Sequence, residues 1–137
     1  MINVDKRIFI LLLLLMGVTL TAACAAARQP GRIELGETEF DLGEISSTGP
    51  VSQTFQMRNA GQGTLEITGV STSCGCTTAE VDRSRLGPGE TATLTVTYDP
   101  QAHGGQMGRF TRVVYVRSDD PETPEANLTI RVTVTGP

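Results

Sequence analysis

The chain has 137 residues and a formal net charge of −4 at pH 7, with three cysteines, one histidine and no tryptophan. From Cys24 onward it contains nine Arg, no Lys and fourteen Asp or Glu, so this part carries a net charge of 9 − 14 = −5. This acidic balance argues against nucleic acid and anionic lipid as partners, and the length suits one domain with its own core.

The first residues have the layout of an export signal. A short basic start, MINVDKR, precedes an apolar run from Ile8 to about Leu20 and then a row of small residues. The apolar run is shorter than the roughly 20 residues that a membrane-spanning helix needs. We therefore predict a cleaved signal rather than a permanent transmembrane helix.

The end of this signal resembles a bacterial lipoprotein box, in which small residues precede a cysteine that receives lipid and becomes the first mature residue. The sequence is Leu20-Thr-Ala-Ala-Cys24, with Thr21 where that box usually has leucine. We predict a lipid anchor on Cys24, a signal peptide over 1–23, a tether over 24–31 and one domain over 32–137. The alternative is ordinary cleavage near 25–27, which would release a secreted or periplasmic domain.

After Cys24 the apolar residues recur with a period of two, and no segment keeps the 3.6-residue period of a helix. In TATLTVTY, for example, Ala92, Leu94, Val96 and Tyr98 share one face while threonines share the other. Such alternation predicts half-buried antiparallel strands. The strands are expected at 33–35, 39–45, 51–58, 64–70, 77–81, 91–98, 110–117 and 127–136. The buried set is expected to include Leu65, Ile67, Leu94, Val96, Val114, Val116, Ile130 and Val132.

Turn signals separate these strands, among them SSTGP, NAGQG, GPGE, DPQAHGG and DDPETPEA. Seven or eight short strands at this spacing predict an all-β fold, an immunoglobulin-like antiparallel β-sandwich. The mature chain lacks tryptophan and a widely spaced cysteine pair, which argues against an antibody-type domain.

The order of four motifs makes the comparison more specific: FDLGEI, VSQTFQMRNAG, LEITGVSTSCGCT and LGPGE. From Phe40 to the end, the chain resembles the bacterial domain-of-unknown-function family 1573, for which the SCGCT core is distinctive. The resemblance implies a sandwich similar to Hydin-like and major-sperm-protein-like domains, in a protein that is exported or lipid-anchored. It implies no particular activity, since the family has none settled.

Cys74 and Cys76 flank a single glycine. In an extended strand their α-carbons would lie roughly 6.5 Å apart, which is near the upper limit for a disulfide. Gly75 can kink the chain and shorten that distance. A disulfide in so small a ring would be easily reduced, and it would suit redox exchange better than stabilisation.

Two thiolates on one face would also supply half of a soft metal site. The segment YDPQAHGGQMGRF contains the only histidine, His103, and also Met107. Thiolate, imidazole and thioether together favour Cu(I). The alternative is that Cys74 and Cys76 are a packing or turn feature, His103 is solvated and Met107 fills the core.

Strand order decides whether these residues meet. If 64–70 ascends and the chain reverses at 73–76, then 77–81 descends and 91–98 climbs to the His103 loop, at the same pole as the cysteines. One long bent strand over 64–81 would instead separate them. We predict the reversal, because Gly75 lies among Ser and Thr, and glycines at 104, 105 and 108 would let the loop fold over the cysteines. The tether then enters at the opposite pole.

Hydrolytic catalysis finds no support in the sequence, which has one histidine, no glycine-rich phosphate loop and no serine elbow. Arg112, Arg117 and Arg131 are expected to pair with the acidic surface. The leading hypothesis is a non-enzymatic binding or scaffolding module of the cell envelope. Lipid on Cys24 would hold it outside the cytoplasm, where it would contact an envelope protein or polymer.

Two alternatives use the cysteine pair. In the first, the chain is a Cu(I)-binding protein with Cys74, Cys76, His103 and Met107 as ligands. In the second, it is a thiol-disulfide redox partner through Cys74 and Cys76. Convergence of all four of these donor atoms within a few ångströms would favour copper, whereas two cysteines alone at an exposed rim would favour redox chemistry or a structural role.

Overall fold

The structure is a computed structural model that describes residues 29–137. The predicted signal peptide and the lipid on Cys24 lie outside the described residues. The elements in chain order are β1 (Ile33–Leu35), β2 (Glu39–Ser46), β3 (Val51–Asn59), β4 (Leu65–Thr72), β5 (Thr77–Val81), β6 (Arg85–Leu86), β7 (Thr91–Tyr98), the 3-10 helix η2 (Pro100–His103), β8 (Gly108–Ser118) and β9 (Glu125–Thr135).

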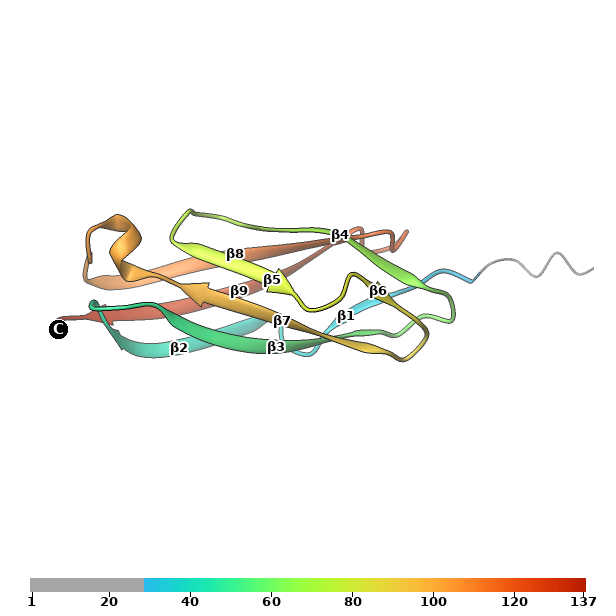
Figure 1. Cartoon of the computed structure of the whole chain (residues 1–137), viewed down its shortest axis with the longest axis horizontal. Helices are drawn as coiled ribbons and strands as arrows, with labels where there is room; N and C mark the ends of the chain where they lie inside the picture. The colour runs from blue at the N-terminus through green and yellow to red at the C-terminus, as the bar shows by residue number, and fades with distance from the viewer. Residues whose placement is uncertain (1–28) are drawn as a thin grey trace, which may run out of the picture.

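Two sheets lie face to face and form an immunoglobulin-like β-sandwich, elongated along its strands (Figure 1). One sheet has the order β1-β3-β7-β5 and the other β2-β9-β8-β4-β6. The all-β sandwich predicted from the alternating sequence is therefore confirmed. Within residues 29–137, no helix has the length and apolar character needed to cross a membrane.

The core follows the predicted alternation. The eight positions expected to be buried are each 5% exposed or less: Leu65, Ile67, Leu94, Val96, Val114, Val116, Ile130 and Val132. The buried residues fall into two clusters, a larger one along the sandwich and a smaller one at one end. The smaller one contains Ile45, Cys76, Tyr98, Val132 and Val134.

The sandwich differs from the prediction in two ways. First, β2 pairs with β9 in parallel, with Ile45 opposite Val134, because both strands run toward the same end of the molecule. Second, β6 is an additional strand of two residues that pairs with the start of β4. Such a short strand has no alternation to detect, although Leu86 is fully buried.

The described chain begins at one end of the sandwich, which we call the tether pole. Gln29–Gly31 run beside the β3–β4 loop, where Gly63 N donates to Pro30 O at 3.1 Å. A Cβ on Gly31 would lie 2.6 Å from the Cα of Leu65, the first residue of β4. Since β4 ends at Thr72, the cysteines that follow lie at the opposite end, the cysteine pole (Figure 1).

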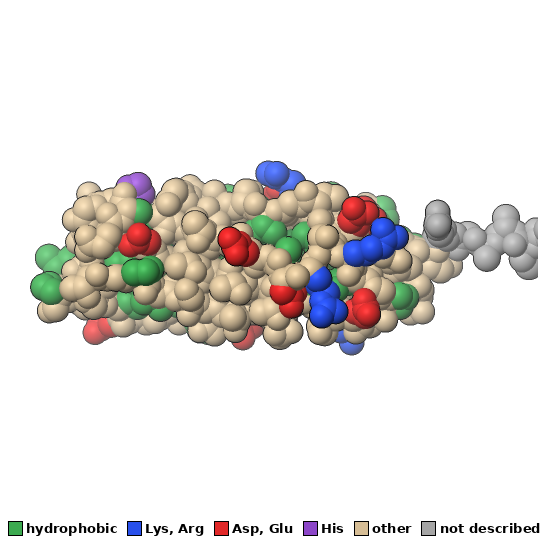
Figure 2. All heavy atoms as spheres, in the orientation of Figure 1, with side chains coloured by type: hydrophobic (Ala, Val, Ile, Leu, Met, Phe, Trp, Pro, Cys, Tyr) green, Lys and Arg blue, Asp and Glu red, His purple; other side chains and the backbone are tan. Residues whose placement is uncertain are grey.

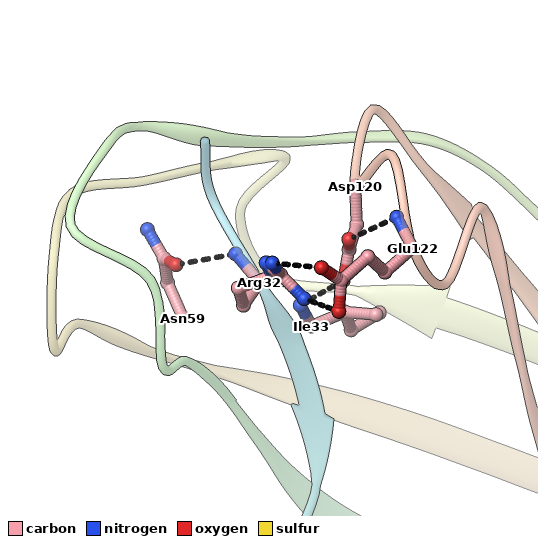
Figure 3. A network of polar contacts seen from close by, with 5 residues as sticks. All are labelled: Arg32, Ile33, Asn59, Asp120 and Glu122. Carbon is pink, nitrogen blue, oxygen red and sulfur yellow. Dashed lines mark hydrogen bonds and ion pairs between the residues drawn. The ribbon is translucent and has the colours of Figure 1, made fainter. Parts of the chain in front are cut away.

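A polar network ties β1 to the β8–β9 turn at the tether pole (Figure 3). The carboxylate of Asp120 accepts from Ile33 N at 3.0 Å and from Glu122 N at 2.9 Å. Arg32 forms a two-pronged ion pair with Glu122. Because β1 and β8 belong to different sheets, this network joins the two sheets where the chain enters.

Candidate functional site

Cys74 and Cys76 lie where the chain crosses from one sheet to the other, between the end of β4 and the start of β5. They are joined by a disulfide, with their α-carbons 5.4 Å apart. Thr77 N donates to Cys74 O at 3.3 Å, and Thr72 Oγ1 donates to the carbonyls of Cys74 and Thr77 at 3.0 and 2.7 Å. This turn brings the cysteines closer than an extended strand would allow.

Gly75 does not adopt the left-handed conformation in this turn. Among the described residues, the glycines with positive φ are Gly43, Gly89, Gly104, Gly105 and Gly108. Apart from its two neighbours, no atom of residues 29–137 lies within 4 Å of the position that a Cβ on Gly75 would take. The turn therefore needs no left-handed residue at position 75, and the space in front of Gly75 is open.

The two sulfur atoms differ in accessibility. Cys76 is 2% exposed and belongs to the small apolar cluster, whereas Cys74 is half-buried at its edge. Thr77 Oγ1 lies 3.6 Å from Cys74 Sγ and 3.7 Å from Cys76 Sγ. A reagent from solvent would therefore meet Cys74 first.

His103 lies beside this pair, as the strand reversal predicts. The loop that carries it is joined to the cysteine turn by Asp99 N, which donates to Cys76 O at 2.8 Å. Gly104 and Gly105 follow with φ of 72° and 71°, in the left-handed region that glycine tolerates. One nitrogen of His103 and the two sulfur atoms all lie within 4.8 Å of one another, with His103 exposed.

Met107 does not fill the core, because it is 68% exposed. Its sulfur lies 3.8 Å from the position of a Cβ on Gly136, just after β9. The structure thus gathers Cys74, Cys76 and His103 at one point and places Met107 on the surface beside the end of the chain.

Arg112 is a residue of this site that sequence reasoning missed. The expected surface pairing holds for Arg117, which pairs with Glu125, and for Arg131, which pairs with Glu39, but it is wrong for Arg112. Instead, Arg112 Nε donates to Cys76 Sγ at 3.0 Å, and Arg112 Nη1 donates to Thr111 O at 2.9 Å.

Two aromatic rings lie near this arginine. Its guanidinium carbon lies 5.0 Å from the ring centre of Phe110 and 5.9 Å from that of Tyr98. The sequence FTRVVYV does indicate that Arg112 faces inward, because it lies two residues from both Phe110 and Val114 and so shares their face of the strand. A charged residue at a core-facing position is costly to bury, so its occurrence points to a specific partner.

These features define an immunoglobulin-like β-sandwich with a cysteine pair, a histidine and an inward arginine at one pole. The chain belongs to the family described as "Protein of unknown function (DUF1573)", whose sequence profile matches residues 33–134. This confirms the resemblance seen in the motifs. No curated protein sequence matches the chain.

Solved structures share the fold. A protein of unknown function from Porphyromonas gingivalis W83 has a TM-score of 0.70 and 26% identity, over 83% of this chain and 51% of that one. This chain therefore spans about half the length of that protein.

Two further structures are similar at much lower identity. The ASH / PapD-like domain 7 of human CEP192 has a TM-score of 0.58 and 8% identity, over 77% of this chain and 86% of that one. The VesB protease of Vibrio cholerae has a TM-score of 0.56 and 18% identity, over 76% of this chain and 31% of that one. At such low identity these two likenesses show the fold alone, and the fold leaves activity open.

Proposed function

We propose that the chain is an exported, lipid-anchored, non-enzymatic binding or scaffolding module of the bacterial cell envelope. The observation that supports this is that the two ends of the sandwich differ. The chain enters at the tether pole, and the cysteine turn and the His103 loop lie at the other end (Figure 1). Lipid on Cys24 would hold the tether pole at the membrane and present the cysteine pole outward.

The visible face carries side chains of every kind along its length. In the view of Figure 2, the basic side chains lie over the middle of the molecule and toward the tether pole, with acidic side chains among them, and hydrophobic side chains show at both ends and in the middle. The partner at the outward pole would be an envelope protein or polymer. Nucleic acid does not fit, given the acidic balance of the chain.

Membrane fractionation tests the anchor. Cys24→Ser should move the protein from the membrane to the soluble fraction, because several acyl chains on one residue are needed for firm retention. Cys74→Ser is the matched control and should stay with the membrane. Unchanged membrane association of Cys24→Ser would support an uncleaved signal anchor instead.

Photo-crosslinking tests the binding pole. A photoreactive residue at Gln101, exposed near His103, should form adducts with envelope components of intact cells. The same group at Gln62, exposed at the tether pole, is the matched control and should form few. Equal yields at the two positions would contradict an outward binding pole.

Cu(I) binding is a second candidate, favoured by the convergence of Cys74, Cys76 and His103 within 4.8 Å. The disulfide must first be reduced, and two thiolates with an imidazole would then offer a soft three-donor set. Reduced protein should bind one Cu(I). Cys74→Ser or Cys76→Ser should weaken binding far more than Met107→Leu, because thiolate is the stronger ligand. Equal Cu(I) affinity in the wild type and the double serine variant would exclude this candidate.

A further inference from the structure

Arg112 brings a positive charge to the cysteine pair, and no carboxylate of the described residues forms an ion pair with it. Among residues 29–137, the arginines in ion pairs are Arg32, Arg58, Arg117 and Arg131, and Arg112 is not one of them. The side chain is half-buried near two aromatic rings, Phe110 and Tyr98, and its Nε donates to Cys76 Sγ. The disulfide sulfur is neutral, so this cation gains an anionic partner when the S–S bond opens and Cys76 becomes a thiolate.

The burial of the two sulfur atoms gives the pair a direction. Cys76 is enclosed by the apolar cluster, and Cys74 lies at its edge with open space in front of Gly75. Thiol-disulfide exchange needs an incoming thiolate at one sulfur and a stabilised departing thiolate at the other. In this geometry Cys74 is the sulfur that an incoming thiolate can reach, and Cys76 is the one whose departing thiolate is stabilised by Arg112.

We propose that Cys74–Cys76 is a directional thiol-disulfide exchange site, in which a partner's dithiol attacks Cys74 and Arg112 receives the departing Cys76 thiolate. The attacking thiolate of the partner bonds to Cys74 Sγ, the Cys74–Cys76 bond breaks, and its electron pair leaves with Cys76 Sγ. A mixed disulfide between the partner and Cys74 results.

The second thiolate of the partner then attacks the partner's own sulfur in that mixed disulfide and releases Cys74. The two protons lost by the dithiol pass to Cys74 and to solvent, and the Cys76 thiolate remains on Arg112. The partner is oxidised by two electrons and this domain is reduced by two. The proposal concerns the domain alone, so it depends on neither the lipid anchor nor Cu(I).

The position of attack can be measured directly. The full chain carrying Cys24→Ser has Cys74 and Cys76 as its only cysteines. It is incubated in the oxidised form with glutathione, quenched with iodoacetamide, and digested for mass spectrometry. Glutathione should be found on Cys74 and the alkyl group on Cys76. Equal labelling or the reverse order would overturn the proposal, as would a disulfide that glutathione and dithiothreitol leave intact.

The role of Arg112 is tested by the rate at which dithiothreitol reduces the disulfide. In Arg112→Met the rate should fall about tenfold, because a charge-assisted hydrogen bond to the departing thiolate is lost. Arg112→Lys keeps the charge and should recover part of that rate. Arg117→Met is the matched control, since Arg117 lies on the outward face of the same strand and pairs with Glu125.

A merely structural arginine would give a different result. In that case Arg112→Met would lower thermal stability of the oxidised protein and leave the reduction rate and the glutathione equilibrium unchanged. We expect the equilibrium of Arg112→Met to shift about tenfold toward the disulfide, since the same hydrogen bond stabilises only the reduced form. An equilibrium unchanged in both Arg112→Met and Arg112→Lys would overturn the role of Arg112.

Discussion

Asn59 is a polar side chain that the fold requires rather than merely tolerates. It is 0% exposed at the end of β3, and all of its hydrogen bonds go to backbone. Its Oδ1 accepts from Arg32 N at 3.0 Å and Gly61 N at 2.9 Å, and its Nδ2 donates to Gly63 O at 2.7 Å and Leu86 O at 3.0 Å. One side chain thus fixes the entering chain, the β3–β4 loop and β6.

Replacing this side chain should be costly. Asn59→Ala is expected to lower the free energy of unfolding by about 2–4 kcal/mol, because it leaves several buried backbone groups without partners. Urea unfolding of the full chain measures the change. Asn127→Ala, at an exposed position of β9, is the control and should change stability by less than about 0.5 kcal/mol. A similar small change in Asn59→Ala would show that water replaces the lost contacts.

At the scale of elements, Asp120 links the short strand β1 to the β8–β9 turn. Burial alone would raise the pKa of its carboxyl group, but N–H donors from Glu122, Ile33 and Thr123, together with the charge of Arg32, hold that pKa below its usual value. The hydrogen bond and charge of Arg32 likewise lower the pKa of Glu122 (Figure 3). The charged carboxylate is therefore the form that stabilises the link.

Stability should depend on pH through this link. A carboxyl group with a depressed pKa in the folded state gives its full stabilisation above its unfolded pKa of about 3.9. This stabilisation is lost as the pH falls through the folded pKa. Asp120→Asn should thus destabilise the protein at neutral pH, and the deficit should shrink in strong acid.

Urea unfolding at neutral pH and below about pH 3 tests this window. Glu125→Gln, which breaks the exposed pair with Arg117, is the control and should cause little loss at either pH. If the stability lost in Asp120→Asn were the same at both pH values, the charge of the Asp120 carboxylate would not contribute to the link.

For the molecule as a whole, the sequence predicts whatever depends on alternation. The two-residue apolar period predicts the main strands and their buried faces. Together with a chain reversal at the cysteines, it also predicts that Cys74, Cys76 and His103 meet. The parallel β2–β9 pair was not predicted, because pairing direction depends on the path of the whole chain. Nor was β6, which is too short to alternate.

The contact of Arg112 escaped prediction for a different reason. Its inward parity was visible in the sequence, but an arginine is expected at the surface, and the partner is a sulfur atom 36 positions away. Non-local contacts of this kind cannot be derived from the spacing of residues. The same holds for the oxidised state of the cysteines, since their distance is set by the turn around Thr72 and Thr77.

The whole sandwich should not depend on its disulfide. The larger core cluster, which includes Leu94, contains neither cysteine, and only the smaller one contains Cys76. The bond joins residues two apart, so it constrains the unfolded chain weakly, by roughly 1.5 kcal/mol on the chain-entropy model. Loss of a core side chain, as in Leu94→Ala, costs about 2–5 kcal/mol.

Reduction of the full chain should therefore leave a folded sandwich. We expect the far-UV circular dichroism of a β protein to persist in dithiothreitol and urea unfolding to remain cooperative, with stability lowered by roughly 1–2 kcal/mol. Leu94→Ala in the oxidised state is the reference and should lose more stability than reduction of the disulfide does. If reduction instead abolished cooperative unfolding, the disulfide would be a structural bond. A domain that stays folded in both states can open and close the Cys74–Cys76 bond repeatedly, as an exchange site requires.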